Sequence, residues 1–288
     1  MIVYFAIHNE RKENMSIICD THLHSSFSGD SDTPIEAMIQ AAVDKGLKEI
    51  CFTEHQDFDF VYQEGEPNDL FEVNTDQYLY DLLQTKDKFA GKIDVSFGIE
   101  LGVQEHLARK LAVYSKSHDF DFIIASSHLC NHKDPYLKEF FEGRSEKEGY
   151  HEYFQYEAAC IKAFRNFDSY GHLDYVLRYG PNKNAEFSMS EYGDDIDVIL
   201  KLLIDNEKAL EINSSGLSPK YGLGQPHPNI EILKRYKELG GELITIGSDA
   251  HTPDRVAGDY DKVEAILKDL GYKYYAVYMQ RMAEMFTL

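Results

Sequence analysis

Histidines and carboxylates recur in this sequence directly after short apolar stretches. His22 and His24 stand two residues apart in CDTHLHSSFSGD, and Asp249 and His251 repeat that spacing in GSDAH. Side chains two apart in an extended segment point to the same side, so each pair can present two ligands together. Asp30 lies six residues beyond His24 in the following loop, and residues of the same types end or follow other stretches: His55, Glu100, His128, His172 and Asp174. Imidazole and carboxylate groups suit zinc, manganese or iron, and this many have room for two or three ions.

A single histidine at the end of a strand is more often a hydrogen-bonded core or loop residue than a metal ligand. Here six of the twelve histidines stand at such ends, and the other six lie elsewhere: His8, His106, His118, His132, His151 and His227. Chance placement would not separate the two sets so cleanly, so the pattern favours a metal site. Divalent cations held there could clamp a phosphate and lower the pKa of a bridging water enough to give hydroxide at neutral pH.

The sequence contains seven β-rich runs, and six of them carry these residues at or beyond their C-terminal ends. The runs cover residues 17–21, 49–53, 93–99, 121–126, 169–171, 209–213 and 243–247. Helical periodicity follows each of them, near residues 34–46, 77–90, 105–116, 150–166, 194–207, 228–239 and 261–270. Strands that alternate with helices imply a parallel sheet with right-handed crossovers. We expect an α/β fold, a closed or nearly closed (β/α)7 barrel with the metal site at the C-terminal ends of its strands, and take an open doubly wound sheet as the alternative.

The first helix carries the clearest start signal. Thr33 can cap its N-terminus, Pro34 suits the first helical position, Glu36 can close a capping box and Gly46 can end the helix. No glycine-rich phosphate-binding motif follows any strand, which counts against a nucleotide-binding version of the fold.

The bulk properties limit the possible partners. The chain has 288 residues, 43% of them hydrophobic, which suits one large domain over residues 17–288 after an N-terminal extension over residues 1–16. Lysine and arginine total 29 against 50 acidic residues, so the net charge of −21 argues against a nucleic-acid partner. The four cysteines are widely spaced, which fits a reducing cytoplasm, and no apolar stretch is long enough for a membrane span.

Taken in order, the segments D-x-H-x-H, TEH, GIE, SSH, GHLD and GSDAH resemble the polymerase and histidinol phosphatase (PHP) family. The resemblance runs from about residue 18 to residue 257. It implies a distorted (β/α)7 barrel and usually a trinuclear metal centre. By position, the first metal would take His22, His24, Glu100 and Asp249; Glu100 would bridge to a second metal with His128 and His172; a third would take Asp30, His55 and His251. Many relatives have histidine at the place of Asp30, so oxygen ligation there could change which ion is preferred.

Within that family the chain is similar to the short, stand-alone histidinol-phosphate phosphatases. The segments GHLDYVLRY, EINSSGL and QPHPN carry this resemblance, together with a length that leaves no room for a polymerase module. It implies a phosphomonoesterase of histidine biosynthesis that hydrolyses L-histidinol phosphate by a metal-bound hydroxide. Glu100, Asp249, Arg178 and His227 are then the expected catalytic residues, and a small phosphorylated molecule is the expected partner.

Arg178 is the first expected substrate contact, because its guanidinium suits bidentate binding of phosphate. Asn213, Ser214 and Ser215 follow the sixth run, where they could donate to phosphate or simply cap the next turn.

Two further contacts are expected on the following segment. A second arginine often follows Ser-Gly-Leu in the relatives, but here Ser218 stands near that place and Lys220 is the nearest cation. His227 lies between two prolines and is a candidate to touch phosphate or protonate the leaving alkoxide; the alternative is an ordinary loop residue.

Residues 54–76 contain eight acidic residues and no lysine or arginine, interleaved with Phe58, Phe60, Tyr62 and Phe71. As the loop after the second strand, this segment should overhang the metal face. Acidic and aromatic groups together suit a substrate with an ammonium and an imidazole group, whereas the alternative is a solvated acidic loop.

Three other functions share these features. A phosphodiesterase or exonuclease of the same family would use the same ligands but should have a basic channel, and the motifs do not exclude a phosphotyrosine-protein phosphatase. A non-catalytic, metal-binding regulatory domain should have lost ligands, yet all nine positions carry residues able to bind metal.

Overall fold

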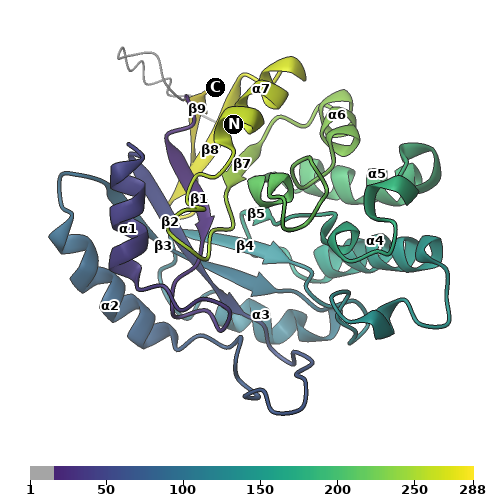
Figure 1. Ribbon diagram of the computed structural model, residues 1–288, viewed down its shortest axis with the longest axis horizontal. Helices are drawn as coiled ribbons and strands as arrows, with labels where there is room; N and C mark the ends of the chain where they lie inside the picture. The colour runs from purple at the N-terminus through teal and green to yellow at the C-terminus, as the bar shows by residue number, and fades with distance from the viewer. Residues whose placement is uncertain (1–15) are drawn as a thin grey trace.

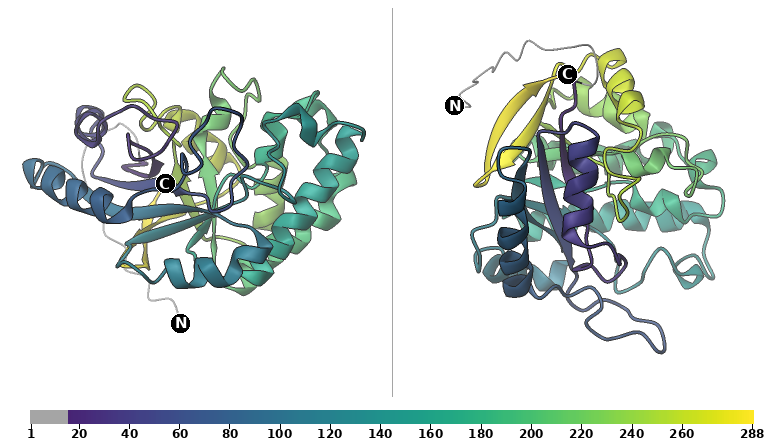
Figure 2. Two further views of the ribbon diagram at one scale, coloured as in Figure 1. Left: turned by 90° about the horizontal axis from the view of Figure 1, so that it is seen from below. Right: turned by 60° about the vertical axis from the view of Figure 1, so that its left-hand side comes forward.

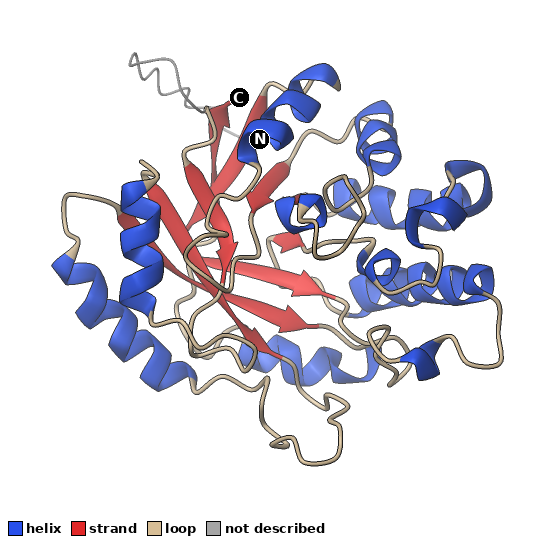
Figure 3. Ribbon diagram, viewed as in Figure 1, coloured by secondary structure: helices blue, strands red, loops and turns tan. Residues whose placement is uncertain are grey.

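A single parallel sheet forms the centre of the molecule (Figures 1 and 3). The computed structural model describes residues 16–288, so the predicted extension lies outside the described residues except for Ser16. The strands are β1 (Cys19–Leu23), β2 (Glu49–Gln56), β3 (Asp94–Gly102), β4 (Phe122–Ser126), β5 (Ser169–Tyr170), β6 (Ala209–Asn213) and β7 (Ile244–Gly247). They pair in sequence order from β1 to β7, all in parallel. Each lies within a few residues of a predicted run.

The two edges of the sheet meet just beyond the end of β7. The backbone N–H of Asp249 donates to the carbonyl of His22 at 2.7 Å, and that of His24 donates to the carbonyl of Ala250 at 2.8 Å. These bonds form a parallel bridge between Leu23 and Ala250 and bring β1 beside β7. The sheet is therefore a nearly closed barrel, as expected, and not the open doubly wound sheet.

Helices surround the barrel, with α1 and α2 beside β1–β3 and α4 and α5 on the far side (Figure 1). They are α1 (Ile35–Asp44), α2 (Thr75–Lys88), α3 (Ala108–Tyr114), α4 (Glu146–Ala163), α5 (Met189–Asp205), α6 (Ile230–Glu238) and α7 (Tyr260–Asp269). Helix α4 begins earlier than predicted because Ser145 and Glu148 form a capping box there. Within residues 16–288, none of the helices is long and apolar enough to cross a membrane.

The predicted cap of α1 is wrong. Pro34 is the N-cap residue and makes no side-chain cap hydrogen bond. The hydroxyl of Thr33 donates instead to the backbone carbonyl of His251, at 2.9 Å. The residue that would start the helix thus ties the loop after β1 to the loop after β7.

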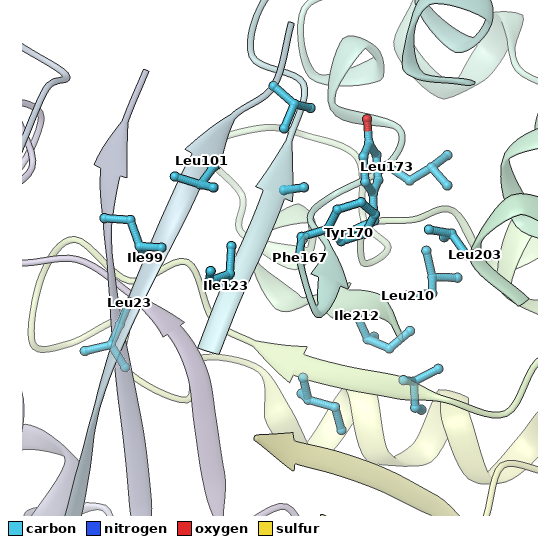
Figure 4. Packing of buried hydrophobic residues seen from close by; sticks show 14 of the residues in the cluster. Leu23, Ile99, Leu101, Ile123, Phe167, Tyr170, Leu173, Leu203, Leu210 and Ile212 are labelled. Carbon is cyan, nitrogen blue, oxygen red and sulfur yellow. The ribbon is translucent and has the colours of Figure 1, made fainter. Parts of the chain in front are cut away.

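Apolar side chains fill the space between the sheet and its helices. Leu101 and Ile123 on neighbouring strands and Leu203 on α5 are all completely buried (Figure 4). Parallel strands covered in this way read as nearly continuous apolar runs, which explains why their positions were visible in the sequence.

A C-terminal hairpin that the sequence did not reveal covers the N-terminal end of the barrel. It consists of β8 (Tyr274–Met279) and β9 (Met282–Thr287) and lies along one side in Figure 2. The backbone N–H of Arg281 donates to the carbonyl of Asp121 at 2.9 Å, just before β4. Gln280 and Arg281 form the turn with φ of 50° and 65°, values that usually require glycine or asparagine. The missing turn signal explains why the hairpin was not predicted.

We expect Tyr278→Ala to lower the free energy of unfolding by about 3 kcal/mol, because Tyr278 is buried and its ring stacks on Phe122 at 5.2 Å between centroids. Urea denaturation with a chelator present measures this without a metal contribution. Met282→Ala is the matched control: Met282 is 66% exposed on the same hairpin, so the change should stay within about 0.5 kcal/mol. Equal losses for both variants would contradict the packing role of Tyr278.

Candidate metal centre

The structure brings all nine predicted ligands together at the C-terminal mouth of the barrel, around Glu100 at the end of β3. Glu100 is fully buried. Its Oε1 lies 3.0 Å from Nε2 of His172 and 3.3 Å from Nε2 of His128. Its Oε2 lies 3.0 Å from Nδ1 of His55, 3.4 Å from Nε2 of His22 and 3.6 Å from Nε2 of His24. The two carboxylate oxygens therefore face two different sets of imidazoles.

Asp249 completes the group formed by the two histidines of β1. Its Oδ1 lies 3.5 Å from Nε2 of His24 and 3.8 Å from Nε2 of His22, and those two nitrogens are 3.1 Å apart. The backbone of Asp249 has a left-handed φ of 54°, uncommon outside glycine, at the point where the chain leaves β7.

A third group lies toward the outside of the mouth. Oδ2 of Asp30 is 3.0 Å from Nε2 of His251 and 3.7 Å from Nε2 of His55. The ring of His24 stacks on both His55 and His251, with centroids 4.3 Å apart in each case. Asp30 is the most exposed of the nine, with 43% of its side chain accessible.

Unsatisfied buried atoms show that these residues fit divalent cations. Within residues 16–288, Oε2 of Glu100, Nε2 of His251 and Nδ1 of His55 are enclosed and make no hydrogen bond. A buried carboxylate oxygen without a hydrogen bond is costly, and a bound cation removes that cost. Ligand atoms of His22, His24 and Asp249 lie within 4.8 Å of one another, as do those of His24, His55 and His251 and those of Glu100, His128 and His172.

The electrostatics favour anionic carboxylates. Burial alone would raise the pKa of Glu100, but His22, His128 and His55 hold it well below its usual range. Burial, together with His251 and His55, lowers the pKa of His24 to about 3, so this imidazole is neutral. Burial opposes a charge on His128, yet Asp57 and Glu100 raise its pKa to about 10. Protons and metal ions thus compete for the same negative centre.

Three buried acids that sequence reasoning did not assign hold the imidazoles in place. Glu211, in the middle of β6, accepts from Nδ1 of His22 at 2.5 Å and from the backbone N–H of His172 at 2.7 Å. Asp57 accepts from Nδ1 of His128 at 2.6 Å. Such carboxylate–histidine contacts fix the ring and its tautomer.

The third acid, Glu54, works through a serine. Its Oε2 accepts from the hydroxyl of Ser28 at 2.6 Å, and Ser28 lies 3.0 Å from Nδ1 of His24. The available sequence signal was an acid inside an apolar run, as in ALEIN and CFTEHQD.

The acidic segment over residues 54–76 lies beside the metal ligands, but not all of its acids are available to a substrate. Glu54 and Asp57 belong to the buried support of the histidines, while Glu64 and Asp69 are exposed. The ring of Phe71 packs edge-on against His55 at 5.6 Å. A Cβ added to Gly29, next to Asp30, would lie 2.1 Å from the carbonyl oxygen of Leu70. The loop therefore packs directly beside the third group.

Arg178 lies beside Asp249, in the short 3-10 helix η3 (Tyr175–Arg178) that follows His172. Its Nη2 donates to Oδ2 of Asp249 at 3.1 Å and to the hydroxyl of Ser215 at 2.6 Å. The guanidinium carbon is 4.5 Å from the ring centroid of Tyr221. Nη1 has no hydrogen bond within residues 16–288 and is not enclosed, so one edge of the guanidinium remains open.

The sequence left two roles open for the NSS segment, and the structure shows capping for Asn213. Its Oδ1 accepts from the backbone N–H of Ser215 at 3.0 Å and from the hydroxyl of Ser215 at 2.5 Å. This caps the 3-10 helix η5 (Ser214–Leu217). The hydroxyl of Ser214 is enclosed and has no partner among the described residues, and that of Ser215 accepts a hydrogen bond from Arg178. The amide nitrogen of Asn213 donates to Oε2 of Glu211 at 3.2 Å, so Asn213 is not a free donor for phosphate.

The expectation that His227 donates a proton needs correction. His227 is fully buried; its Nδ1 donates to Asp174, and its Nε2 accepts from Nε of Arg178 at 2.8 Å. Burial lowers the pKa of His227, in keeping with a neutral ring. Both ring nitrogens of His227 already have hydrogen-bond partners, so this residue positions Arg178 and does not act as the proton donor. Lys220 is exposed, with Nζ 5.1 Å from the ring centroid of Tyr221.

Residues 20–215 match the PHP domain family. The chain is 33% identical over 255 residues to the histidinol-phosphatase of Lactococcus lactis, an alignment that covers 88% of this chain and 91% of that one. It is 35% identical over 240 residues to a "Probable histidinol-phosphatase" of Clostridium acetobutylicum, covering 83% and 89%. A solved structure of the Lactococcus lactis histidinol phosphate phosphatase, in complex with zinc, L-histidinol and phosphate, superposes with a TM-score of 0.83 at 32% identity, covering 92% and 98%.

We expect Glu100→Gln to lose bound metal and to lower turnover by more than about 100-fold, because a neutral amide no longer balances cations on both of its sides. Elemental analysis of the dialysed protein measures the metal. Glu49→Gln is the matched control: Glu49 is also buried, but it begins β2 at the opposite end of the barrel. Full metal content and normal turnover in Glu100→Gln would contradict its central place.

Proposed function

Since the chain belongs to the PHP domain family, we propose that it is a divalent-metal-dependent phosphomonoesterase that hydrolyses L-histidinol phosphate to L-histidinol and phosphate. The observation that carries the proposal is the carboxylate of Glu100 between two sets of imidazoles, with the open edge of Arg178 fixed nearby. The histidinol-phosphatase of Lactococcus lactis supports the choice of substrate, because the alignment covers nearly the whole of both chains.

The metals in this proposal are two or three ions of zinc, manganese or iron. The first would be held by His22, His24, Glu100 and Asp249, the second by Glu100, His128 and His172, and the third by Asp30, His55 and His251. Bound there, divalent cations supply Lewis acidity: they lower the pKa of a water and offset the charge of the phosphoryl oxygens.

The chain's own residues prepare the phosphoryl group for transfer to water. Arg178 presents Nη1 to a phosphoryl oxygen while Asp249, Ser215 and His227 keep its guanidinium in one orientation. Because these contacts exist before substrate arrives, little reorganisation is needed as charge builds up in the transition state. A nucleophilic side chain is not required for this reaction.

Several finer predictions from the sequence remain part of this proposal. A place in histidine biosynthesis follows from the substrate. A cytoplasmic location is supported by four cysteines that are all free. The net charge of −21 favours a small phosphomonoester over a nucleic-acid strand.

A substrate screen tests the proposal directly. The purified protein, supplied in turn with manganese, zinc or iron, should hydrolyse L-histidinol phosphate with a higher kcat/KM than nitrophenyl phosphate, phosphotyrosine peptides or phosphodiesters. Activity should disappear on thorough chelation and return with metal. A preference for diesters or single-stranded DNA would establish the exonuclease alternative, and full turnover without metal would refute the metal-dependent chemistry.

We expect Arg178→Ala to lower kcat/KM about 100-fold with near-normal metal content, because its partner is phosphate. Arg178→Lys tests geometry separately, since a lysine keeps the charge but not the planar fork. Arg235→Ala is the control: Arg235 also pairs with an acid, Asp197, but on the outer helices. Loss of metal or of thermal stability in both Arg178 variants would assign the residue a structural role.

A further inference from the structure

Asp134 is a buried acid that none of the roles above involves. It lies in the segment after β4, six residues beyond His128, and only 8% of it is exposed. Its Oδ1 accepts a hydrogen bond from the backbone N–H of Tyr136 at 2.8 Å. Its other oxygen, Oδ2, accepts no hydrogen bond within residues 16–288 and is not enclosed, so a ligand can reach it.

The charged groups around Asp134 act in opposite directions. Of the charges that act on it most strongly, His128 favours the ionised carboxylate, whereas Asp57 and Glu66 oppose it. Asp57 is already the hydrogen-bond partner of His128. Burial raises the pKa of Asp134 to about 6. A buried carboxylate in such a place is costly unless a cation pairs with it.

A row of tyrosines connects Asp134 with the metal ligands. The ring of Tyr175 lies 5.1 Å from that of His172, and the ring of Tyr179 lies 5.1 Å from that of Tyr175. Tyr136 meets Tyr179 edge-on at 5.4 Å and is 61% exposed, so the outer end of the row opens to solvent. The row runs outward from the metal centre and ends at the residue whose backbone binds Asp134.

We propose that Asp134 binds the ammonium group of the substrate, with Tyr175 and Tyr179 packing against the part that links the ammonium to the phosphate. This inference rests on the proposed function, because it takes the phosphate to lie at the metal centre and Arg178. A phosphomonoester that also carries an amine matches both ends of this arrangement: cations and a guanidinium for the phosphate, and an unpaired carboxylate for the amine. Aromatic faces further favour a cationic organic group over a neutral one.

Asp134→Asn tests the inference with little disturbance of the fold, because the amide oxygen can still accept from the N–H of Tyr136. We expect kcat/KM for L-histidinol phosphate to fall about ten- to a hundredfold, as for the loss of one charge-assisted hydrogen bond. For nitrophenyl phosphate, which has no amine, it should change less than about twofold. Glu139→Gln, at an exposed acid on the same segment after β4, is the matched control and should alter neither value.

A second measurement avoids dependence on the natural substrate. L-Histidinol should inhibit nitrophenyl phosphate hydrolysis by the unmodified enzyme, and its inhibition constant should rise about tenfold or more in Asp134→Asn. The deaminated analogue of L-histidinol should inhibit both proteins equally.

The outcomes separate the two proposals. Equal losses on both substrates in Asp134→Asn, with metal content intact, would remove Asp134 as the ammonium site and leave the proposed function standing. An unmodified enzyme that hydrolyses nitrophenyl phosphate but not L-histidinol phosphate would refute the proposed substrate. If L-histidinol then inhibits no better than its deaminated analogue, the ammonium site is overturned as well.

Discussion

Buried negative charge is the constraint on which the C-terminal mouth of the barrel depends. Glu54, Glu100 and Glu211 are completely buried, and Asp57 and Asp249 nearly so. Arg178 is the guanidinium that pairs with this cluster, through Asp249. Carboxylates gathered in this way repel one another and lose hydration, so they are tolerable only with imidazolium or metal cations among them. Most of the surrounding imidazoles are hydrogen-bonded at Nδ1, which leaves Nε2 directed at the carboxylates and free to bind a cation. The same arrangement that would destabilise an ordinary core is thus what selects divalent cations here.

The register between neighbouring strands fixes where these buried charged side chains lie relative to one another. His55 on β2 stands directly beside Glu100 on β3, and the two strands stay in register over eight residue pairs. If β3 were shifted by one residue against β2, Glu100 would point away from the mouth of the barrel and an apolar neighbour would point into it. The opposite end of the barrel contributes packing: the C-terminal hairpin covers it through Tyr278 and the backbone of Arg281. Stability and chemistry are therefore located at opposite ends of the same strands, as is usual for parallel barrels.

The sequence was most informative where one physical rule dominates. Apolar runs bounded by helices predicted all seven parallel strands, because burial on both faces leaves few polar residues in them. The two-residue spacings in CDTHLH and GSDAH identified four candidate ligands that the structure brings to one end of the barrel, because alternation along an extended segment is a local property. Hydrogen bonds between residues that are far apart in the sequence were not predicted. Glu211 supports His22 across the barrel, and Asp57 supports His128. Asp174 holds His227, and His227 accepts a hydrogen bond from Arg178. The sequence interpretation of His227, as a residue that touches phosphate, donates a proton or lies in an ordinary loop, did not include this contact with Arg178.

The failed prediction for the first helix shows how function overrides a local rule. Thr33 has the right residue type and position for a cap, which would stabilise the helix by about 1 kcal/mol. Its hydroxyl binds the carbonyl of His251 instead, and Ser31 donates to the same oxygen, each at 2.9 Å. Nδ1 of His251 lies 3.0 Å from the carbonyl of Asp249, whose own backbone is left-handed. The start of α1, the left-handed turn at Asp249 and the candidate ligands Asp249 and His251 therefore form one unit. The uncapped helix and the left-handed backbone cost stability, but they fix the directions of these two side chains. Departures from local rules that cluster in this way mark a site whose geometry matters more than the stability of its parts.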